Sequence, residues 1–119
     1  MGDLLISGTT GSPGVATGRV IIIDDIRDVT KVRPGDVLVM LRSTPDWVQA
    51  LKQASAVISV MGGKTSHAAI VSRELGIPCV VRADDAMEIL KNGQMVTVDG
   101  TNGKVYRADG GNPLIGGKE

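Results

Sequence analysis

A single histidine, His67, ends a stretch rich in glycine and hydroxyl groups, Gly62–His67 (GGKTSH). The polar residues before it and the small and apolar residues after it predict that a helix begins here. The first turn of a helix presents unpaired backbone N–H groups and the positive end of the helix dipole, which stabilise a bound anion. Thr65 or Ser66 can hydrogen-bond to helix N–H groups, to a ring nitrogen or to a phosphate oxygen. A neutral imidazole in this place can attack a phosphoryl group.

Other kinds of site fit these residues less well. Cys79 is the only cysteine, and with one histidine it cannot complete a metal site. Residues 63–65 (GKT) resemble part of a Walker A motif, but the glycine that the motif needs five residues earlier is Ile58. No Gly-x-Ser-x-Gly elbow surrounds Ser66 or Ser72. The spacing alone is equally consistent with an ordinary polar histidine at the surface.

The elements that must position His67 are a strand before it and a helix that contains it. Ala56–Val60 is an apolar run typical of a buried strand, and it ends just before the glycines. The helix is predicted over Thr65–Leu75, with Gly76 as its left-handed cap and Pro78 beyond it. The other predicted elements are strands over Arg19–Ile23, Val37–Leu41 and Cys79–Val81, helices from Thr44 to about Ala54 and over Asp84–Leu90, and a hairpin of Met95–Asp99 with Lys104–Arg107.

Two glycine-rich segments are predicted to lie outside these elements. Gly8–Gly18 is dense in turn formers and is predicted to lead as a loop into the first strand. Gly110–Glu119 shows no periodicity, which predicts a tail or a linker. We therefore assign residues 1–108 to one domain and residues 109–119 to the tail. The order of the elements predicts a single α/β domain, a sandwich with a mixed sheet.

Composition excludes several classes of function. The 119 residues carry 13 basic and 13 acidic side chains, so the net charge of zero gives no reason to expect nucleic acid or an anionic membrane as partner. One Trp, one Tyr and no Phe leave no aromatic platform for stacking bases. The apolar runs are far shorter than the roughly 20 residues that span a bilayer, and no secretory signal is seen. A lone cysteine fits a reducing compartment, so we predict a cytoplasmic protein.

Residues 62–73 (GGKTSHAAIVSR) resemble the phosphohistidine signature of the phosphoenolpyruvate-utilising enzymes. Residues 12–18, 44–46 and 74–81 resemble the flanking parts of the same domain, so the resemblance covers most of the chain. It implies a swivelling β/β/α fold in which His67 is phosphorylated and Thr65 holds the ring or its phosphate. The other positions that it implies near the phosphate are Gly62, Gly63, Ser66 and Arg73, of which Arg73 could equally be an exposed helix arginine.

The same resemblance implies that the domain works with others. Its partners would be an ATP-grasp nucleotide-binding domain and a TIM-barrel phosphoenolpyruvate/pyruvate domain, in the same chain or in trans. Mg²⁺ would be bound by those partners, and this domain would bind no metal or cofactor itself. We therefore predict a phosphoryl-carrier component of a phosphotransferase, incomplete on its own.

Two departures from the family pattern keep a different class of function open. Arg82 stands where a small residue or glycine is usual, and Val60 stands where an acidic or polar residue is frequent. The alternative is a binding module that keeps the fold but has lost phosphotransfer. Residues 32–39 (VRPGDVLV) also resemble part of a lipoyl- or biotinyl-type carrier, but the lysine that those domains modify at a hairpin tip is missing.

Overall fold

The computed structural model describes residues 2–108, in which strands alternate with short helices. The strands are β1 (Leu4–Ser7), β2 (Thr9–Ser12), β3 (Val15–Ile22), β4 (Val37–Met40), β5 (Ala56–Ser59), β6 (Cys79–Val81), β7 (Met95–Asp99) and β8 (Lys104–Arg107). The α-helices are α1 (Val48–Gln53), α2 (His67–Leu75) and α3 (Ala86–Ile89), and the 3₁₀ helices are η1 (Ile26–Lys31) and η2 (Pro45–Trp47).

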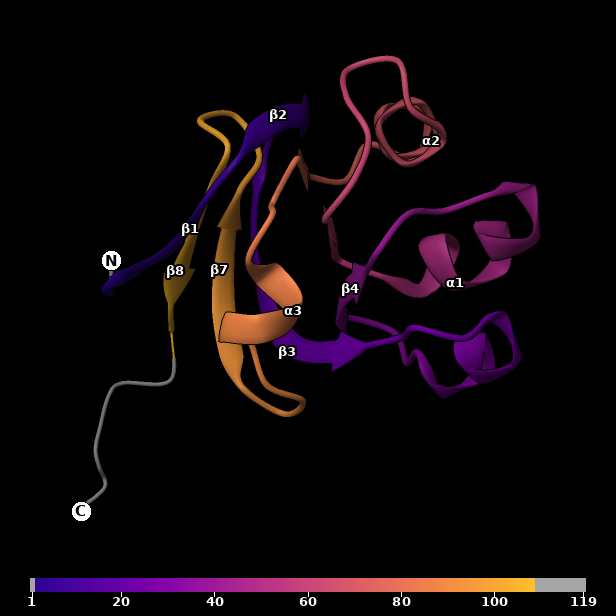
Figure 1. Cartoon of the computed structure of the whole chain (residues 1–119), viewed down its shortest axis with the longest axis horizontal. Coiled ribbons are helices and arrows are strands. Elements are labelled where there is room, and N and C mark those ends of the chain that lie inside the picture. Colours follow the sequence, from indigo (N-terminus) through magenta and orange to yellow (C-terminus); the bar gives the residue numbers. More distant parts are fainter. Residues whose placement is uncertain (1, 109–119) are drawn as a thin grey trace.

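Strand β3 belongs to two sheets, and this divides the strand order β1-β8-β7-β3-β4-β5-β6-β2 into two layers. Its first part pairs antiparallel with β7, and its last part, from Val20, pairs parallel with β4. We call β1, β8, β7 and the start of β3 the antiparallel sheet. The end of β3 with β4, β5, β6 and β2 is the mixed sheet. Figure 1 shows the antiparallel sheet on one side and α1, α2 and η1 on the other, with β4 between them.

Side chains of the mixed sheet alternate between two apolar cores, because successive residues of a strand face opposite ways. In β4, Val37 and Val39 pack toward the antiparallel sheet, whereas Leu38 and Met40 pack toward the helices. The helix side also receives Trp47, Leu51, Ala68 and Ala69. Each central strand of the mixed sheet is therefore apolar on both faces, as its unbroken apolar sequence indicates.

The first and last strands of the described chain lie next to each other. Strand β1 pairs antiparallel with β8, with Leu4 opposite Tyr106. The Arg107 N–H donates to the carbonyl oxygen of Asp3 at 2.8 Å. This edge lies on the opposite side of the molecule from α2 (Figure 1).

The predicted fold class, a single α/β domain with a mixed sheet, is confirmed. The final hairpin has the predicted bounds. The helix predicted from Thr44 begins with η2 and continues as α1. Gly76 caps α2 in the left-handed conformation, with φ of 74°. The predicted tail, residues 109–119, lies outside the described residues. No helix within residues 2–108 has the length and apolar character needed to cross a membrane.

The prediction that Gly8–Gly18 is a loop is wrong. Strand β2 pairs with β6 here, and β3 begins at Val15, which leaves only a turn between them. Glycine serves close packing as well as turning. A Cβ on Gly11 would lie 2.9 Å from the Cys79 sulfur, so glycine lets β2 approach β6. The sequence analysis also missed strand β1.

Candidate functional site

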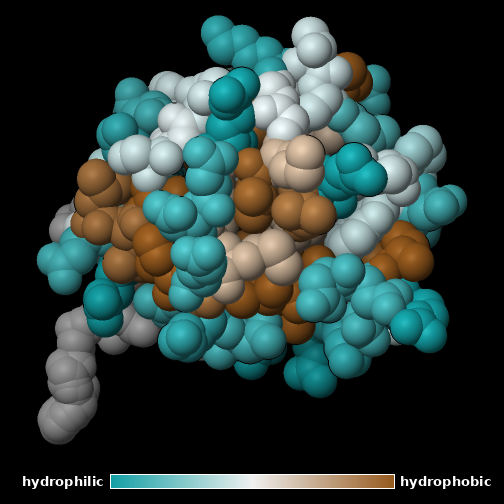
Figure 2. Space-filling view, in the orientation of Figure 1, coloured by the Kyte–Doolittle hydropathy of each residue, from teal (hydrophilic) through white to brown (hydrophobic). Residues whose placement is uncertain are grey.

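His67 lies at the carboxyl end of the mixed sheet, where it is the first residue of α2. Strands β4 and β5 run parallel, so the loops that follow them meet at this end. The chain leaves β5, turns through the glycines and enters α2 at the imidazole. The side chain of His67 is half-buried, so the ring is accessible from solvent and yet held by its surroundings. Side chains over the loop before α2, at the top of Figure 2, are mostly pale or hydrophilic.

Ser43 orients the imidazole. Its Oγ lies 2.7 Å from Nδ1 of His67, and the serine is only 9% exposed. Ser43 lies in the loop that follows β4, and because β4 pairs parallel with β5, this loop lies beside the one that leads to His67. With Nδ1 bonded to this hydroxyl, Nε2 is the ring nitrogen left to react.

The hydroxyl that bonds the ring is that of Ser43. The sequence analysis offered Thr65 or Ser66 for a ring nitrogen or a phosphate oxygen, and their contact with a phosphate stays a prediction. Thr65 is exposed in the turn before α2. Ser66 donates its hydroxyl to the carbonyl oxygen of Gly63 at 2.7 Å. The sequence analysis took Ser43 only as part of a helix start. Its position after a neighbouring parallel strand was the signal that could have found it.

Gly62 is required by the shape of the loop, whereas Gly63 is not. Gly62 has φ of +107°, a conformation that other residues rarely adopt. A Cβ there would lie 2.8 Å from the Ser66 side chain. A Cβ on Gly63 would meet nothing within 4 Å. Gly62 and Ser66 therefore close the turn tightly, while Gly63 leaves open space beside the loop.

The first turn of α2 has no side-chain cap. Ser66 is the N-cap residue, but its hydroxyl bonds backward to Gly63 and not to a helix N–H. The positive end of the helix and its unbonded N–H groups thus adjoin the imidazole. Lys64 is exposed in the same turn. This environment suits an anionic group close to the ring.

Arg73 ties the loop to the sheet. Its Nη1 donates to the carbonyl oxygen of Gly11 at 2.5 Å, and its Nη2 donates to that of Lys64 at 2.8 Å. Arg73 therefore acts in the structure as a link between β2 and the turn before His67. A contact from Arg73 to phosphate stays a prediction.

The two residues that depart from the family pattern lie at the same end of the sheet. Val60 donates its N–H to Met40, and Ala83, next to Arg82, donates to Ser59, so the chain continues side by side beyond β4, β5 and β6. Arg82 has φ of +55°, the one positive φ of a non-glycine residue within the described part of the chain. A glycine at this position would adopt that conformation without strain.

Cys79 lies beneath α2 and takes no part in a reactive site. It is fully buried in β6, and burial raises the pKa of its thiol from 9.0 to about 11. A thiol with so high a pKa is a poor nucleophile at neutral pH. Among residues 2–108, no group of three or more His, Cys, Asp or Glu side chains is placed to hold a metal ion.

Comparison with protein families and curated proteins gives consistent matches. Residues 32–103 match the family described as "PEP-utilising enzyme, mobile domain". The chain is 51% identical over 105 residues to phosphoenolpyruvate synthase of Pyrococcus furiosus, covering 88% of this chain and 13% of that protein. It is 53% identical over 104 residues to a probable phosphoenolpyruvate synthase of Methanothermobacter thermautotrophicus, covering 87% and 15%. The chain therefore spans only a small part of the length of these relatives.

Solved structures share the fold. The solution structure of Enzyme I (nEIt) matches with a TM-score of 0.58 and 29% identity, over 67% of this chain and 33% of that one. Aconitase X of Thermococcus kodakaraensis matches with a TM-score of 0.68 over 87% of this chain and 98% of the matched chain. Its identity of 22% shows likeness of fold alone.

Proposed function

Because the chain belongs to the family of mobile domains of phosphoenolpyruvate-utilising enzymes, we propose that it carries a phosphoryl group on Nε2 of His67 between two active sites in other domains. The observation that carries this proposal is the Ser43 bond to Nδ1, 2.7 Å long, at the uncapped start of α2. The bond holds the ring while the other nitrogen stays available.

The proposed step is a reversible transfer between oxygen and nitrogen. The lone pair of Nε2 attacks the phosphorus of the donor, and a P–N bond forms. The bond from phosphorus to the leaving oxygen of the donor breaks, and that oxygen keeps the electron pair. In the second half of the cycle an acceptor oxygen attacks the phosphorus, and the electron pair of the P–N bond returns to Nε2.

The surroundings of His67 serve both halves of this cycle. The N–H groups at the start of α2 stabilise the phosphoryl oxygens, with Thr65 and Ser66 nearby in the turn. Open space at Gly63 lets the donor approach. Phosphorylation adds about −1.5 to −2 charges to a chain of zero net charge. Docking to a partner surface would therefore change with phosphorylation.

The donor and acceptor sites belong to partner domains in this proposal. The named relatives are phosphoenolpyruvate synthases, and this chain spans 13 to 15% of their length. We infer that an ATP-grasp domain and a TIM-barrel phosphoenolpyruvate domain supply the reacting partners and their Mg²⁺.

The test is phosphate labelling of the chain in trans. The chain is incubated with phosphoenolpyruvate, or with ATP, and with a phosphoenolpyruvate synthase whose own carrier histidine has been replaced. Intact-mass measurement should show one added phosphate that is labile to acid and stable to base. Phosphorus NMR should place it on Nε2.

Variants of the chain distinguish the carrier proposal from the alternative of a binding module without phosphotransfer. His67→Ala and His67→Gln should remove the label completely, while Lys52→Ala, an exposed change on α1, should label like the unmodified chain. Circular dichroism checks that each variant is folded. Folded protein that takes no label from either donor would reject the carrier proposal and leave the binding module as the function.

A further inference from the structure

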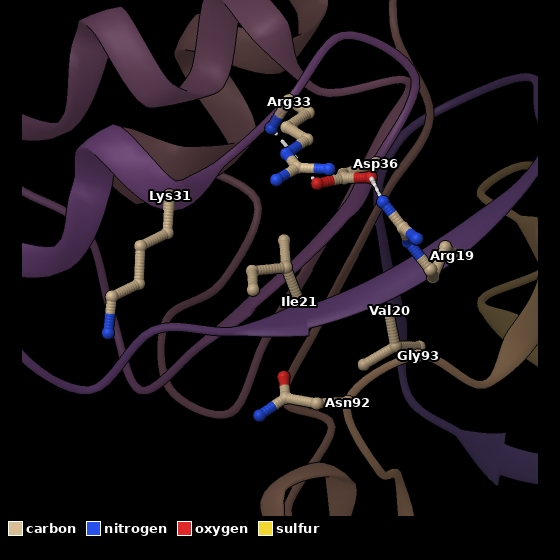
Figure 3. Close-up of a pocket in the computed structure, with 8 residues that line it drawn as sticks. All are labelled: Arg19, Val20, Ile21, Lys31, Arg33, Asp36, Asn92 and Gly93. Carbon is tan, nitrogen blue, oxygen red and sulfur yellow. Dashed lines mark hydrogen bonds and ion pairs between the residues drawn. The ribbon is translucent and has the colours of Figure 1, made fainter.

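A pocket with several charged side chains in its lining opens at the other end of β4 from His67. Its volume is about 450 Å³, within the rough range of 300 to 1,000 Å³ of sites for small molecules. Figure 3 shows the side chain of Ile21, from β3, between the polar groups that surround it. The polar residues that line the pocket are Arg19, Lys31, Arg33, Asp36 and Asn92.

Asp36 anchors one wall of this pocket. The residue is 6% exposed, and its Oδ2 accepts the backbone N–H of Arg33 at 2.9 Å. Its Oδ1 lies 3.8 Å from Nη2 of Arg19. The hydroxyl of Ser55 donates to the carbonyl oxygen of Gly35 at 2.8 Å, which fixes the same turn to the start of β5. The position of the wall is thus determined by buried and backbone contacts.

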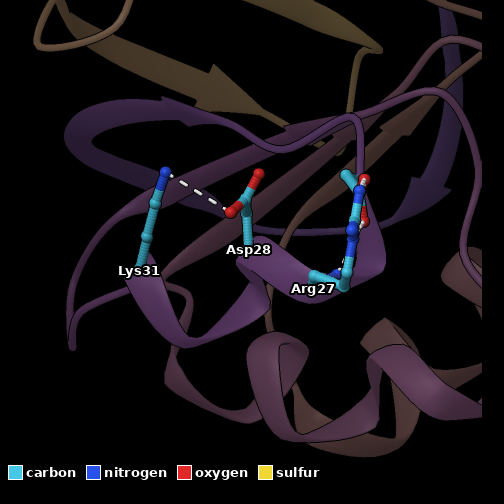
Figure 4. A network of polar contacts seen from close by, with 4 residues as sticks. Arg27, Asp28 and Lys31 are labelled. Carbon is cyan, nitrogen blue, oxygen red and sulfur yellow. Dashed lines mark hydrogen bonds and ion pairs between the residues drawn. The ribbon is translucent and has the colours of Figure 1, made fainter.

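Asn92 and Lys31 face this wall from two other segments. The Oδ1 of Asn92 accepts the N–H of Ile22 at 2.6 Å, so the amide of Asn92 keeps its two N–H groups as donors. Lys31 pairs with Asp28 at 3.4 Å on η1 (Figure 4). The side chains of Lys31 and Asp28 are 65% and 41% exposed, and ion pairs this accessible to solvent contribute little free energy. Lys31 can therefore turn to a ligand at small cost.

The charges of the pocket favour a doubly charged anion. Three cations, those of Arg19, Lys31 and Arg33, line it against the single carboxylate of Asp36. This leaves a surplus of about two positive charges among the lining residues, with Asp28 beside Lys31 outside the lining. A phosphate group carries about two negative charges and offers three acceptor oxygens, which suit guanidinium donors. We propose that this pocket binds a small molecule through a phosphate or diphosphate group.

This binding site is separate from the carrier histidine. Asp36 precedes β4 and Ser43 follows it, so the rise of a strand places them roughly 20 Å apart. A ligand in the pocket therefore does not touch the imidazole. Binding in this pocket does not require phosphotransfer on His67, so loss of either function would leave the other unaffected.

The experiment is an NMR titration of the ¹⁵N-labelled chain at constant ionic strength. The probes are inorganic phosphate, pyrophosphate and glutarate, a dicarboxylate of similar charge. We expect saturable shifts of the backbone N–H signals of Val20, Arg33 and Gly93, with pyrophosphate binding more tightly than phosphate and glutarate binding weakest. Arg33→Gln and Lys31→Gln should each weaken pyrophosphate binding about tenfold.

Matched variants decide whether the pocket is responsible. Arg107→Gln and Lys52→Gln remove the same charges from exposed positions outside the pocket, and they should bind pyrophosphate as the unmodified chain does. Shifts that do not saturate, or equal weakening in the control variants, would overturn the site. Equal affinity for glutarate would overturn the proposed phosphate class. Arg19→Gln provides a second pocket variant if Arg33→Gln does not fold.

Discussion

The two ends of β4 hold their polar groups in different ways. At the carboxyl end, Ser43 bonds to one ring nitrogen of His67, and the loop beside it is closed by Gly62 and Ser66. At the amino end, one buried carboxylate, Asp36, lies among cations that remain exposed. The first arrangement fixes one atom, which suits formation of a covalent bond. The second offers adaptable charge, which suits reversible binding.

Replacing one glycine at each end should give the largest contrast. Gly62 and Gly35 both have positive φ, but only at Gly62 would a Cβ collide with a neighbour. Gly35→Ala should lower the free energy of unfolding by about 1 kcal/mol, the strain of a left-handed alanine. Gly62→Ala should lower it by about 3 kcal/mol, because overpacking adds to that strain. Urea denaturation measures both. Equal losses would show that the loop before α2 is no tighter than the turn before β4.

Alkaline pH should lower the stability of the mixed sheet, which contains both β4 and the buried Cys79 of β6. The pKa of the Cys79 thiol is raised from 9.0 to about 11 by burial. Below pH 9 the thiol is protonated in both the folded and unfolded states, and its contribution to stability is fully present. Between pH 9 and 11 the unfolded state ionises first, so stability should fall by up to about 1.4 kcal/mol per pH unit. The loss should be complete above the folded pKa.

The measurement is urea denaturation at several pH values, compared with Cys79→Ala. The alanine variant removes the thiol, so the difference between the two proteins isolates its titration from that of other groups. If the two proteins lost stability in parallel above pH 9, the thiol would not be held in its neutral form.

Removing the Ser43 hydroxyl tests whether a fixed nitrogen matters. Ser43→Ala should slow phosphate labelling about tenfold, equivalent to about 1.4 kcal/mol in the barrier, because the ring loses its orienting bond. Ser43→Thr should restore most of the rate. Long-range ¹H–¹⁵N spectra of the imidazole should show the tautomer of His67 change in the alanine variant only. A normal labelling rate with an unchanged tautomer would show that Ser43 does not position the ring.

The smallest expected effect concerns Arg82. Its left-handed conformation strains a non-glycine residue, so Arg82→Gly should raise the free energy of unfolding by about 0.5 to 1 kcal/mol. Arg82→Ala removes the guanidinium but keeps the strain, and it should leave stability nearly unchanged. Thermal denaturation distinguishes the two. A similar gain in both variants would trace the effect to charge and not to the backbone.

Local signals explain which parts of the fold could be predicted. The helix ending at Gly76 and the hairpin from Met95 to Arg107 are marked by caps and turns within a few residues. Strand β2, by contrast, has the sequence Thr-Thr-Gly-Ser and is a strand because it pairs with β6. Propensity cannot reveal an element that depends on a distant partner.

The candidate site likewise has parts that could be predicted from the sequence and parts that could not. His67 and its glycines form one short motif, and the sequence was sufficient to single them out. Ser43 reaches the ring only because two parallel strands end together. The pocket around Asp36 draws its lining from residues as far apart as Arg19 and Gly93. The position of Ser43 and the lining of the pocket depend on contacts between distant segments, which residue types alone do not predict.

The pairing of β1 with β8 also has a mechanical consequence. The first and last strands of the described chain therefore lie about 5 Å apart at one edge, the spacing of neighbouring strands. The edge formed by β1 and β8 lies across the molecule from α2 (Figure 1). If the domain rotates about this edge, the groups farthest from the edge move through the longest path. A modest rotation of the whole domain about the edge formed by β1 and β8 would therefore move the imidazole of His67 farther than groups near that edge, with both sheets kept intact.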